Sequence, residues 1–289
     1  MLRGRRVVVI DAGTHSVKLL LVRESLGGLR VLVRECMDLR QEGLLSPEDF
    51  SHHLRRRLQE LDYDQVALVL PQHLSISQII DLPSNEDSPV SGLIEEEIVK
   101  LSGLSESAIV YHYIPIRPFA SYQNPFWVTL CRERDVLLQT DRLALGQGDV
   151  CEITPTGSAM IATFQSDPAL PQNALLLNIG AENTVAVIVL EGQGVSASTF
   201  PIGGNMFTEA LAADLDRPME EAEEIKRSRE LFGSLETHPR FRAGFEDWCA
   251  HTRRTLQEWI DDPRFARVDR GEFTILVCGG GAAQPGLIG

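Results

Sequence analysis

Blocks of apolar residues separated by short polar turns fill the first part of the chain. The run VVVI at 7–10, the run VKLLLVRE at 17–24 and the run LRVLVREC at 29–36 are all rich in Val and Leu. Runs of this length and composition, each bounded by a turn, are typical of strands. Their short connections predict an antiparallel meander of three strands.

An amphipathic helix is predicted directly after the meander. Ser46 is placed to cap its N-terminus, Pro47 follows at the first helical position, and acidic residues occupy the first turn. Apolar side chains recur on one helix face, at Phe50, Leu54, Leu58 and Leu61. The stretch DQVALVLP at 64–71 then predicts a buried strand. The order of elements is strand, strand, strand, helix, strand.

The same order recurs in the second half of the chain. Three strand-like runs separated by turns cover 174–200, and helical patterns follow at 205–215, 218–232 and 241–260. The run FTILVC at 273–278 predicts a closing strand that leads into three glycines.

The two copies align at their first turns, where Asp11 falls on Asn178 and Gly13 on Gly180. A repeat of this length is too long for a solenoid. It predicts an α/β fold with two related halves, each a mixed sheet with helices on its faces. Two such halves would form a cleft, with one turn from each half pointing into it.

The segment between the two copies has a different pattern. HLSISQIIDLPS at 73–84 alternates like an edge strand, and an acidic helix, two strands and a further helix are predicted over 86–146. This is the content of a small α+β subdomain. The sequence therefore predicts a first half at 1–72 and 154–172, an inserted subdomain at 73–153, and a second half at 173–289.

Composition and charge narrow the functional classes. The chain has 289 residues, 43% hydrophobic and 24% charged, and a formal net charge of -14. This composition is typical of a globular domain, and the negative charge disfavours non-specific binding of nucleic acid. The N-terminal apolar run is four residues long and ends at Asp11, which is too short for a signal peptide or a membrane span. A cytoplasmic protein without direct membrane insertion is predicted.

Five cysteines are scattered without metal-ligand or CxxC spacing, at positions 36, 131, 151, 249 and 278. Their odd number argues against a disulfide framework and favours a reducing compartment. They are interpreted as five small buried residues.

The first turn carries the strongest candidate chemistry. Asp11 lies where a strand meets the turn and can hold a hydrated Mg²⁺, and Gly13 lets the backbone bend towards a phosphate. Thr14 and Ser16 add hydroxyl donors. An ordinary Asp- and Gly-containing hairpin turn fits the same residues, so both interpretations stay open.

The second turn has a different chemistry. Asn178 cannot replace a carboxylate as a ligand of Mg²⁺ or as a base, and Glu182 places a negative charge where a phosphate would approach. Only Gly180 and Thr184 are suited to a phosphate. Catalysis through this turn is not expected, and the sequence assigns no catalytic residue.

Two further motifs follow in the second half. Glu223 and Lys226 lie three residues apart on one helical face, where they can hold a ribose and the edge of a base or form an ordinary exposed salt bridge. The glycines at 279, 280 and 281 directly follow the closing strand. A flat group can lie against such a backbone, although a tight turn between strand and helix fits equally well.

The order of these motifs resembles the actin/Hsp70/sugar-kinase ATPase superfamily. Within it, the chain is most similar to the PilM family of type IV pilus assembly proteins, which is related to FtsA. The similarity rests on VIDAGTHSVKLL, FPIGGNMFTEALA, EITPTGSAMI and ILVCGGGAAQPGL, and it covers nearly the whole chain. The resemblance implies an actin-like fold with two phosphate loops and an adenosine loop.

The resemblance implies a binding site for ATP with Mg²⁺ in the cleft between the halves. Its residues would lie around the phosphates (Asp11, Gly13, Thr14, His15, Ser16, Lys18, Gly180, Thr184), at the ribose or base (Glu223, Lys226) and against the adenosine (Gly279, Gly280, Gly281). The metal would be held by Asp11 through water.

The resemblance also implies a partner. Family members bind the N-terminal cytoplasmic tail of the inner-membrane protein PilN, in a groove beside the inserted subdomain. Such a groove is expected to be apolar, because the tail anchors through aliphatic side chains. The protein is expected to lie at the inner membrane through this partner, and self-association stays open.

Two features depart from the family pattern. Asn178, Glu182 and Asn183 stand where the usual second phosphate loop has Asp, Gly and Thr. At most a weak ATPase is therefore expected. The sequence also ends at Gly289, where relatives usually continue with a helix, so the chain is truncated or its second half is abbreviated.

Three functions are compatible with this sequence. The first is an ATP-binding scaffold of a type IV pilus or related secretion machine, with slow or absent hydrolysis. The second is a nucleotide-free adaptor similar to the cytoplasmic domain of the type II secretion protein GspL. The third is a small-molecule kinase of the same superfamily, which would need a carboxylate where Asn178 stands.

Overall fold

The structure is a computed structural model of the chain. It describes residues 4–26, 28–39, 42–43, 46–83, 89–103, 108–143, 145, 150–265 and 273–287, without the side chains of residues 47 and 264. The chain divides into two compact units. Unit 1 comprises Met1–Ile76, Asn85–His112 and Thr129–Ala159, and unit 2 comprises Ser77–Ser84, Tyr113–Val128 and Met160–Gly289. The three-part division expected from the sequence stays a prediction.

Unit 1 contains a five-stranded sheet in the order β3-β2-β1-β4-β8. Its strands are β1 (Arg6–Ala12), β2 (Ser16–Ser25), β3 (Gly28–Asp38), β4 (Gln65–Leu70) and β8 (Val150–Pro155). β1, β2 and β3 pair antiparallel, whereas β4 runs parallel to both β1 and β8. The predicted meander and the returning strand are confirmed.

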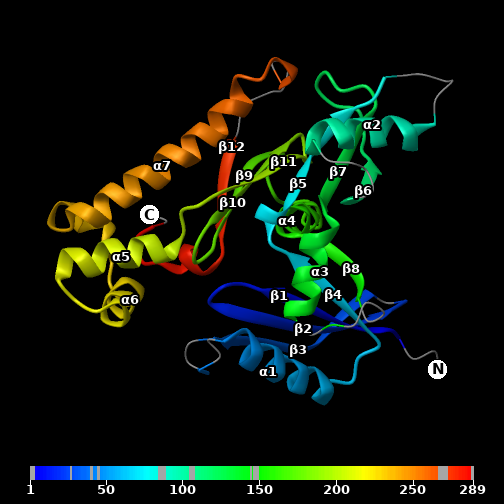
Figure 1. Cartoon of the computed structure of the whole chain (residues 1–289). Helices are drawn as coiled ribbons and strands as arrows, with labels where there is room; N and C mark the ends of the chain where they lie inside the picture. The colour runs from blue at the N-terminus through cyan, green and yellow to red at the C-terminus, as the bar shows by residue number, and fades with distance from the viewer. Residues whose placement is uncertain are drawn as a thin grey trace. The chain divides into compact units, whose positions relative to one another are not determined.

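Helix α1 (Pro47–Glu60) covers one face of this sheet (Figure 1). Its N-terminus is capped as the sequence predicted, because the Ser46 hydroxyl accepts a hydrogen bond of 3.0 Å from the backbone N–H of Asp49. Phe50, Leu54 and Leu58 are buried against the sheet. The amphipathic pattern therefore marked the packed face correctly.

Unit 2 repeats this arrangement with β9 (Asn173–Ile179), β10 (Thr184–Leu190), β11 (Gln193–Phe200) and β12 (Phe273–Cys278). β9, β10 and β11 form an antiparallel meander, and β12 is parallel to β9. The whole sheet has seven strands in the order β12-β9-β10-β11-β5-β7-β6. The duplication predicted from the sequence is confirmed.

One strand expectation is wrong. β5 (Ser75–Asp81) lies between β11 and β7 (Pro125–Arg132), and the two edge strands of the sheet are β12 and β6 (Ile109–Pro115). Alternation in β5 reflects its two faces, since Ser77 and Ile79 are buried while Ile76 is exposed. Alternation reports which face of a strand is covered, and it says nothing about whether both edges are hydrogen-bonded.

The remaining helices lie between the strands in the order of the chain. The α-helices not yet named are α2 (Val90–Ser102), α3 (Glu133–Arg142), α4 (Thr156–Gln165), α5 (Gly204–Leu215), α6 (Met219–Ser228) and α7 (Pro239–Ile260). Short 3-10 helices are η1 (Gln72–Leu74), η3 (Phe232–Thr237), η4 (Pro263–Phe265) and η5 (Gly280–Ala283). The helices predicted at 205–215, 218–232 and 241–260 are confirmed, with the second ending early at Ser228.

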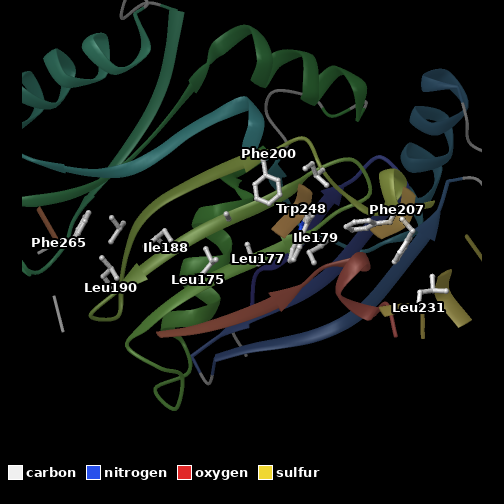
Figure 2. Packing of buried hydrophobic residues seen from close by; sticks show 14 of the residues in the cluster. Leu175, Leu177, Ile179, Ile188, Leu190, Phe200, Phe207, Leu231, Trp248 and Phe265 are labelled. Atoms are coloured by element: carbon white, nitrogen blue, oxygen red, sulfur yellow. The ribbon is translucent and has the colours of Figure 1, made fainter. Parts of the chain in front are cut away.

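Both faces of the β9–β10 pair are buried. Leu175, Leu177 and Ile188 pack with Phe207 and Trp248 of α5 and α7 (Figure 2). The alternate residues of the same strands pack on the other face, beside α4. A strand buried on both faces is apolar without alternation, which is the pattern of the run at 184–190.

The cysteines differ from the expectation that all five are buried. Only Cys131 is buried, while Cys36, Cys151 and Cys278 are exposed and Cys249 is intermediate. The exposed three lie on strands, where side chains alternate between a covered and an open face. No helix within the described residues is long and apolar enough to cross a lipid bilayer.

Candidate functional site

The two hairpin turns singled out by the sequence have the same backbone geometry. The N–H of Gly13 donates to the carbonyl of Ser16 at 3.0 Å, and the N–H of Gly180 donates to the carbonyl of Asn183 at 2.9 Å. An added Cβ would lie 3.1 Å from the carbonyl oxygen at the first turn and 3.0 Å at the second. Glycine keeps both turns tight.

The first turn joins β1 to β2 and brings the candidate charges together. Lys18 donates a hydrogen bond of 2.7 Å to the carboxylate of Asp11, its cross-strand partner. The Asp11 side chain is 40% exposed and that of Lys18 is 57% exposed. The pair is therefore open to a ligand, and the Lys18 ammonium already neutralises the Asp11 carboxylate.

The remaining residues of the first turn are placed by the meander. The carbonyl of His15 accepts a hydrogen bond of 2.9 Å from the N–H of Leu39, just beyond β3. Thr14 is exposed at the tip, and His15 and Ser16 are partly exposed. The turn is held by its backbone, so the side chains at its tip are available to a ligand.

The second turn differs because a helix begins beside it. The N–H groups of Gly204 and Asn205, at the start of α5, donate to the carbonyls of Gly180 and Ala181 at 2.9 and 2.7 Å. The first N–H groups of a helix have no partner within the helix and are common anion sites. Here protein carbonyls take two of these N–H groups.

Gly203 permits this close approach. A Cβ at this position would lie 2.7 Å from the backbone of both Ala181 and Asn183. Only glycine allows the turn and the helix start to meet at this distance. The pair Gly203 and Gly204 was part of the sequence resemblance, but it was not among the expected site residues.

Thr184 is an internal residue of the second turn. Its side chain is fully buried, and its hydroxyl donates to the carbonyl of Ile202 at 2.7 Å. The same oxygen accepts a hydrogen bond of 3.0 Å from the indole N–H of Trp248. Thr184 thus joins β10 to the segment before α5 and to α7, a role that the sequence expectation of a phosphate contact did not include.

Lys226 is also internal, which excludes the exposed salt bridge considered from the sequence. Its side chain is 9% exposed. The ammonium donates to the carbonyl of Gly204 at 2.8 Å and to the hydroxyl of Thr208 at 2.6 Å, and it pairs with Glu223 at 2.6 Å. A lysine has three N–H donors, so all are used within the protein. Lys226 fixes α5 to α6.

Glu223 receives donors on both carboxylate oxygens. Lys226 and the Thr208 hydroxyl approach one oxygen, and Arg227 donates to the other at 2.7 Å. Burial would raise the pKa of Glu223, but the hydrogen bonds from Lys226 and Thr208 outweigh it and lower the pKa to about 2. For Lys226, burial lowers the pKa, and its contact with Glu223 opposes this shift.

The three glycines after β12 have different surroundings. Gly279 has a φ of +89°, and a side chain there would collide with Asn178 and the backbone of Ile179. A side chain at Gly281 would collide with the side chain of Ile179. Gly280 has open space around its Cβ position. Two glycines therefore serve packing, and the middle one leaves a bare backbone surface.

Contacts within unit 2 close into a ring. The second turn bonds to the start of α5, and α5 bonds to α6 through Lys226. Beyond α6, the side chain of Glu230 lies so close to Gly286 that a side chain at position 286 would clash with it. Gly281 is packed on Ile179, next to the second turn. The ring links the candidate adenosine loop, the candidate ribose helix and the second turn within one unit.

The donors near the first turn decide whether it fits the expected Mg²⁺. No cluster of three or more His, Cys, Asp or Glu side chains that fits a metal ion occurs among the described residues. Asp11 offers one partly exposed carboxylate. Mg²⁺ is commonly held by one or two carboxylates together with phosphate oxygens and water. The first turn therefore fits Mg²⁺ that arrives with a nucleotide and does not form a metal site by itself.

A duplicated meander, with a parallel strand beside the first strand of each copy and a glycine turn in each copy, defines a protein of the actin-like fold. The sequence model of the family described as type IV pilus assembly protein PilM matches residues 9–289. The chain belongs to this family.

Solved structures share this fold. A PilM–PilN type IV pilus biogenesis complex is 20% identical, with a TM-score of 0.66 over 96% of this chain and 82% of that chain. MreB5 of Spiroplasma citri bound to AMPPNP is 14% identical, with a TM-score of 0.51 over 98% and 87%. EutJ from Carboxydothermus hydrogenoformans is 14% identical, with a TM-score of 0.50 over 97% and 78%. A comparison with curated protein sequences found no match.

Proposed function

We propose that this chain is an ATP-binding scaffold of a type IV pilus or related secretion machine. In this proposal it binds ATP with Mg²⁺ and the N-terminal tail of a PilN-like inner-membrane protein, through which it lies at the membrane. The observation that carries the nucleotide proposal is the repeated hairpin turn. Its first copy combines tight glycine geometry with an accessible carboxylate and ammonium, Asp11 and Lys18.

Each candidate motif is proposed to have one part in nucleotide binding. Asp11 and the tip of the first turn would act on the phosphates and their Mg²⁺, while Lys18 adds positive charge. In unit 2, the open backbone at Gly280 would take the nucleoside. The solved MreB5 structure contains AMPPNP, which supports nucleotide binding in proteins of this fold.

Hydrolysis is proposed to be slow or absent. The position equivalent to Asp11 in the second turn is Asn178, whose cross-strand partner is Val185 where the first turn has Lys18. An amide cannot act as a general base. ATP would act as a clamp whose presence changes the affinity for the partner.

The partner proposal rests on the family and on the solved PilM–PilN complex. A synthetic peptide with the N-terminal tail of the PilN-like protein encoded in the same genome would be titrated into the protein. Binding of this peptide but not of a scrambled one is expected. Equal affinity for both peptides would contradict the proposal.

The decisive nucleotide experiment is calorimetric titration with MgATP and with MgAMPPNP. Similar binding of both is expected, because hydrolysis does not contribute. Asp11→Ala should lose the Mg²⁺-dependent part of binding and stay folded, since Asp11 is partly exposed. Glu24→Ala is the matched control, because Glu24 is an exposed carboxylate further along β2. Unchanged binding by Asp11→Ala would exclude the first turn as a phosphate site.

A nucleotide-free adaptor is the second candidate. It is favoured by the second turn, where the Thr184 hydroxyl is internal, two helix N–H groups are taken by carbonyls and Glu182 is exposed. Absence of binding at millimolar MgATP, together with retained binding of the partner peptide, would select this function.

A further inference from the structure

Exposed apolar side chains gather in unit 1 where β2 ends and β3 begins. Leu26 is fully exposed, Leu29 is 74% exposed and Val31 is 55% exposed. Leu26 and Leu29 are the two most exposed large apolar side chains in the described part of the chain. Single apolar residues are common on protein surfaces, whereas a cluster of them marks a contact with another protein or with a membrane.

Arginines lie directly behind these apolar residues. Arg23 and Arg30 are direct cross-strand partners, and Arg23 is also opposite Arg6. Arg6 pairs with Asp62 and Asp64, but Arg23 and Arg30 are exposed and have no ion-pair partner among the described residues. Like charges directly opposite each other destabilise a sheet. An anion beside Arg23 and Arg30 would remove this repulsion, so the pair points to an anionic surface.

The charge of this end differs from that of the chain as a whole. Arg5 is exposed too, and its carbonyl accepts the N–H of Glu24 at 2.7 Å, which places it beside the end of β2. Glu24 is the one carboxylate in the ranges 23–26 and 28–31. The formal net charge of the chain is -14. An anionic bilayer therefore repels most of the chain and attracts this end of unit 1.

β3 is an edge strand of its sheet, but it is poorly suited to pair with a strand of another chain. Leu21 is opposite Val33 and Val22 is opposite Val31, so the pairing with β2 skips Leu32. Such a bulge, together with charged residues at 30 and 34, commonly prevents pairing between sheet edges. A lipid surface needs no backbone hydrogen bonds, so it fits this end better than a second strand does.

We propose that this end of β2 and β3 binds the surface of a bilayer that contains anionic phospholipid. This contact goes beyond the proposed function and requires neither ATP nor the partner peptide. Leu26 and Leu29 enter the boundary between headgroups and acyl chains, while Arg23 and Arg30 bind headgroup phosphates. The contact stays at the interface, and no segment spans the bilayer. It orients unit 1 at a membrane to which the proposed partner already holds the protein.

The test is co-sedimentation of the full chain with sucrose-loaded vesicles. Wild type should bind vesicles of phosphatidylcholine with phosphatidylglycerol but not of phosphatidylcholine alone, and added salt should weaken binding. Leu26→Asn and Leu29→Thr should each weaken binding about tenfold, because each removes one leucine from the interface. Arg30→Gln should weaken binding about fivefold, the effect of one arginine near an anionic surface. These residues are exposed, so the variants should unfold at the same denaturant concentration as wild type.

Two variants are matched controls. Leu138→Asn on α3 removes a leucine that is 56% exposed, and Arg254→Gln on α7 removes an exposed arginine. Both should bind the anionic vesicles as wild type does. A second measurement reports the environment of the strand end. The fluorescence of Leu26→Trp, with that of wild type subtracted, should shift to shorter wavelength when anionic vesicles are added, and that of Leu138→Trp should not.

Three results would overturn the proposal. The first is that wild type does not bind the anionic vesicles at low salt. The second is that Leu138→Asn weakens binding as much as Leu26→Asn does. The third is a wild-type dimer in lipid-free sedimentation velocity that Leu26→Asn dissociates, which would assign this surface to a second copy of the chain. None of these results changes the outcome expected for the titrations with MgATP or the partner peptide, so failure here is distinct from failure of the proposed function.

Discussion

A lysine whose three N–H groups all donate hydrogen bonds within the protein has no N–H group left for a ribose. Lys226 illustrates this, because Gly204, Thr208 and Glu223 take its three N–H groups. The Glu223 carboxylate still has lone pairs to offer, and its charge is stabilised by donors on both oxygens.

The Glu223 carboxylate predicts a specific dependence of stability on pH. Its pKa is lowered from an ordinary value of 4.5 to about 2 in the folded protein. The stabilisation is therefore complete above about pH 4.5 and is lost as the pH falls towards 2. Glu223→Gln should reduce the free energy of unfolding at pH 7 by roughly 1–3 kcal/mol. In urea titrations from pH 7 to pH 2.5, its difference from wild type should shrink below about pH 4.5.

Glu220→Gln is the matched control for this experiment. Glu220 lies in the first turn of the same helix and is exposed. It should change stability by less than about 0.5 kcal/mol at every pH. A difference between wild type and Glu223→Gln that stays constant from pH 7 to pH 2.5 would contradict the assignment.

The glycine turn gives a second prediction at the residue scale. Gly281→Ala should cost roughly 1–3 kcal/mol, because the new methyl group collides with Ile179. Gly280→Ala should change stability by less than about 0.5 kcal/mol, because its Cβ enters open space. Denaturant unfolding of both variants measures the difference. Equal costs would mean that the packing of η5 on β9 is not as described.

The two alanines also separate packing from ligand binding. Gly280→Ala should weaken MgATP binding while leaving stability intact, since the methyl group covers the backbone surface proposed for the nucleoside. The sequence grouped these glycines as one motif. Their different surroundings depend on Ile179, about 100 residues earlier in the chain, so a local pattern cannot distinguish them.

At the scale of elements, the Thr184 hydroxyl connects β10, the segment before α5 and α7. It donates to Ile202 and accepts from Trp248, and it has no contact with solvent. The sequence placed Thr184 in a phosphate loop because the turn pattern was similar to that of the first copy. It had no signal for Trp248, whose helix reaches the turn only through the tertiary fold.

Removal of this hydroxyl should loosen the three elements together. Thr184→Val should lower the free energy of unfolding by roughly 1–3 kcal/mol, because it leaves the Trp248 N–H and the Ile202 carbonyl unpaired. Thr199→Val on β11 is the matched control, since the Thr199 hydroxyl is buried without a partner among the described residues. It should be neutral or stabilising. If denaturant unfolding gives both variants the same stability, the Thr184 hydroxyl does not stabilise the contact between these elements.

The order and type of the helices and strands were largely predictable from the sequence, but the place of each strand within its sheet was not. Apolar periodicity and the Ser46 cap located the meander and α1, because these signals are local. The place of β5 between β11 and β7 was missed, because strand pairing depends on partners far away in sequence. The burial of Lys226 was missed for the same reason, because its partner Gly204 on α5 lies 22 residues earlier in the chain.

At the scale of the whole molecule, each unit has its own hydrophobic core. The core around Leu54 lies in unit 1, and the core around Leu211 lies in unit 2. Both side chains are fully buried. Alanine at either position should cost about 2–5 kcal/mol. Scanning calorimetry should therefore show two transitions, and Leu54→Ala and Leu211→Ala should each lower a different one.

The control for this pair is Leu138→Ala on α3, whose side chain is 56% exposed. It should move neither transition. A single transition that both core variants lower equally would show that the two cores unfold as one cooperative unit.

The two transitions also test whether ATP uses the first turn. A ligand that binds only the folded state stabilises it by about 2.7 kcal/mol at 100 times its Kd. MgATP bound through Asp11 should raise the transition that Leu54→Ala lowers. Asp11→Ala should keep both transitions of the free protein, and MgATP should no longer raise the one lowered by Leu54→Ala. If MgATP raises only the transition of unit 2 in wild type, the first turn is a hairpin without a phosphate role.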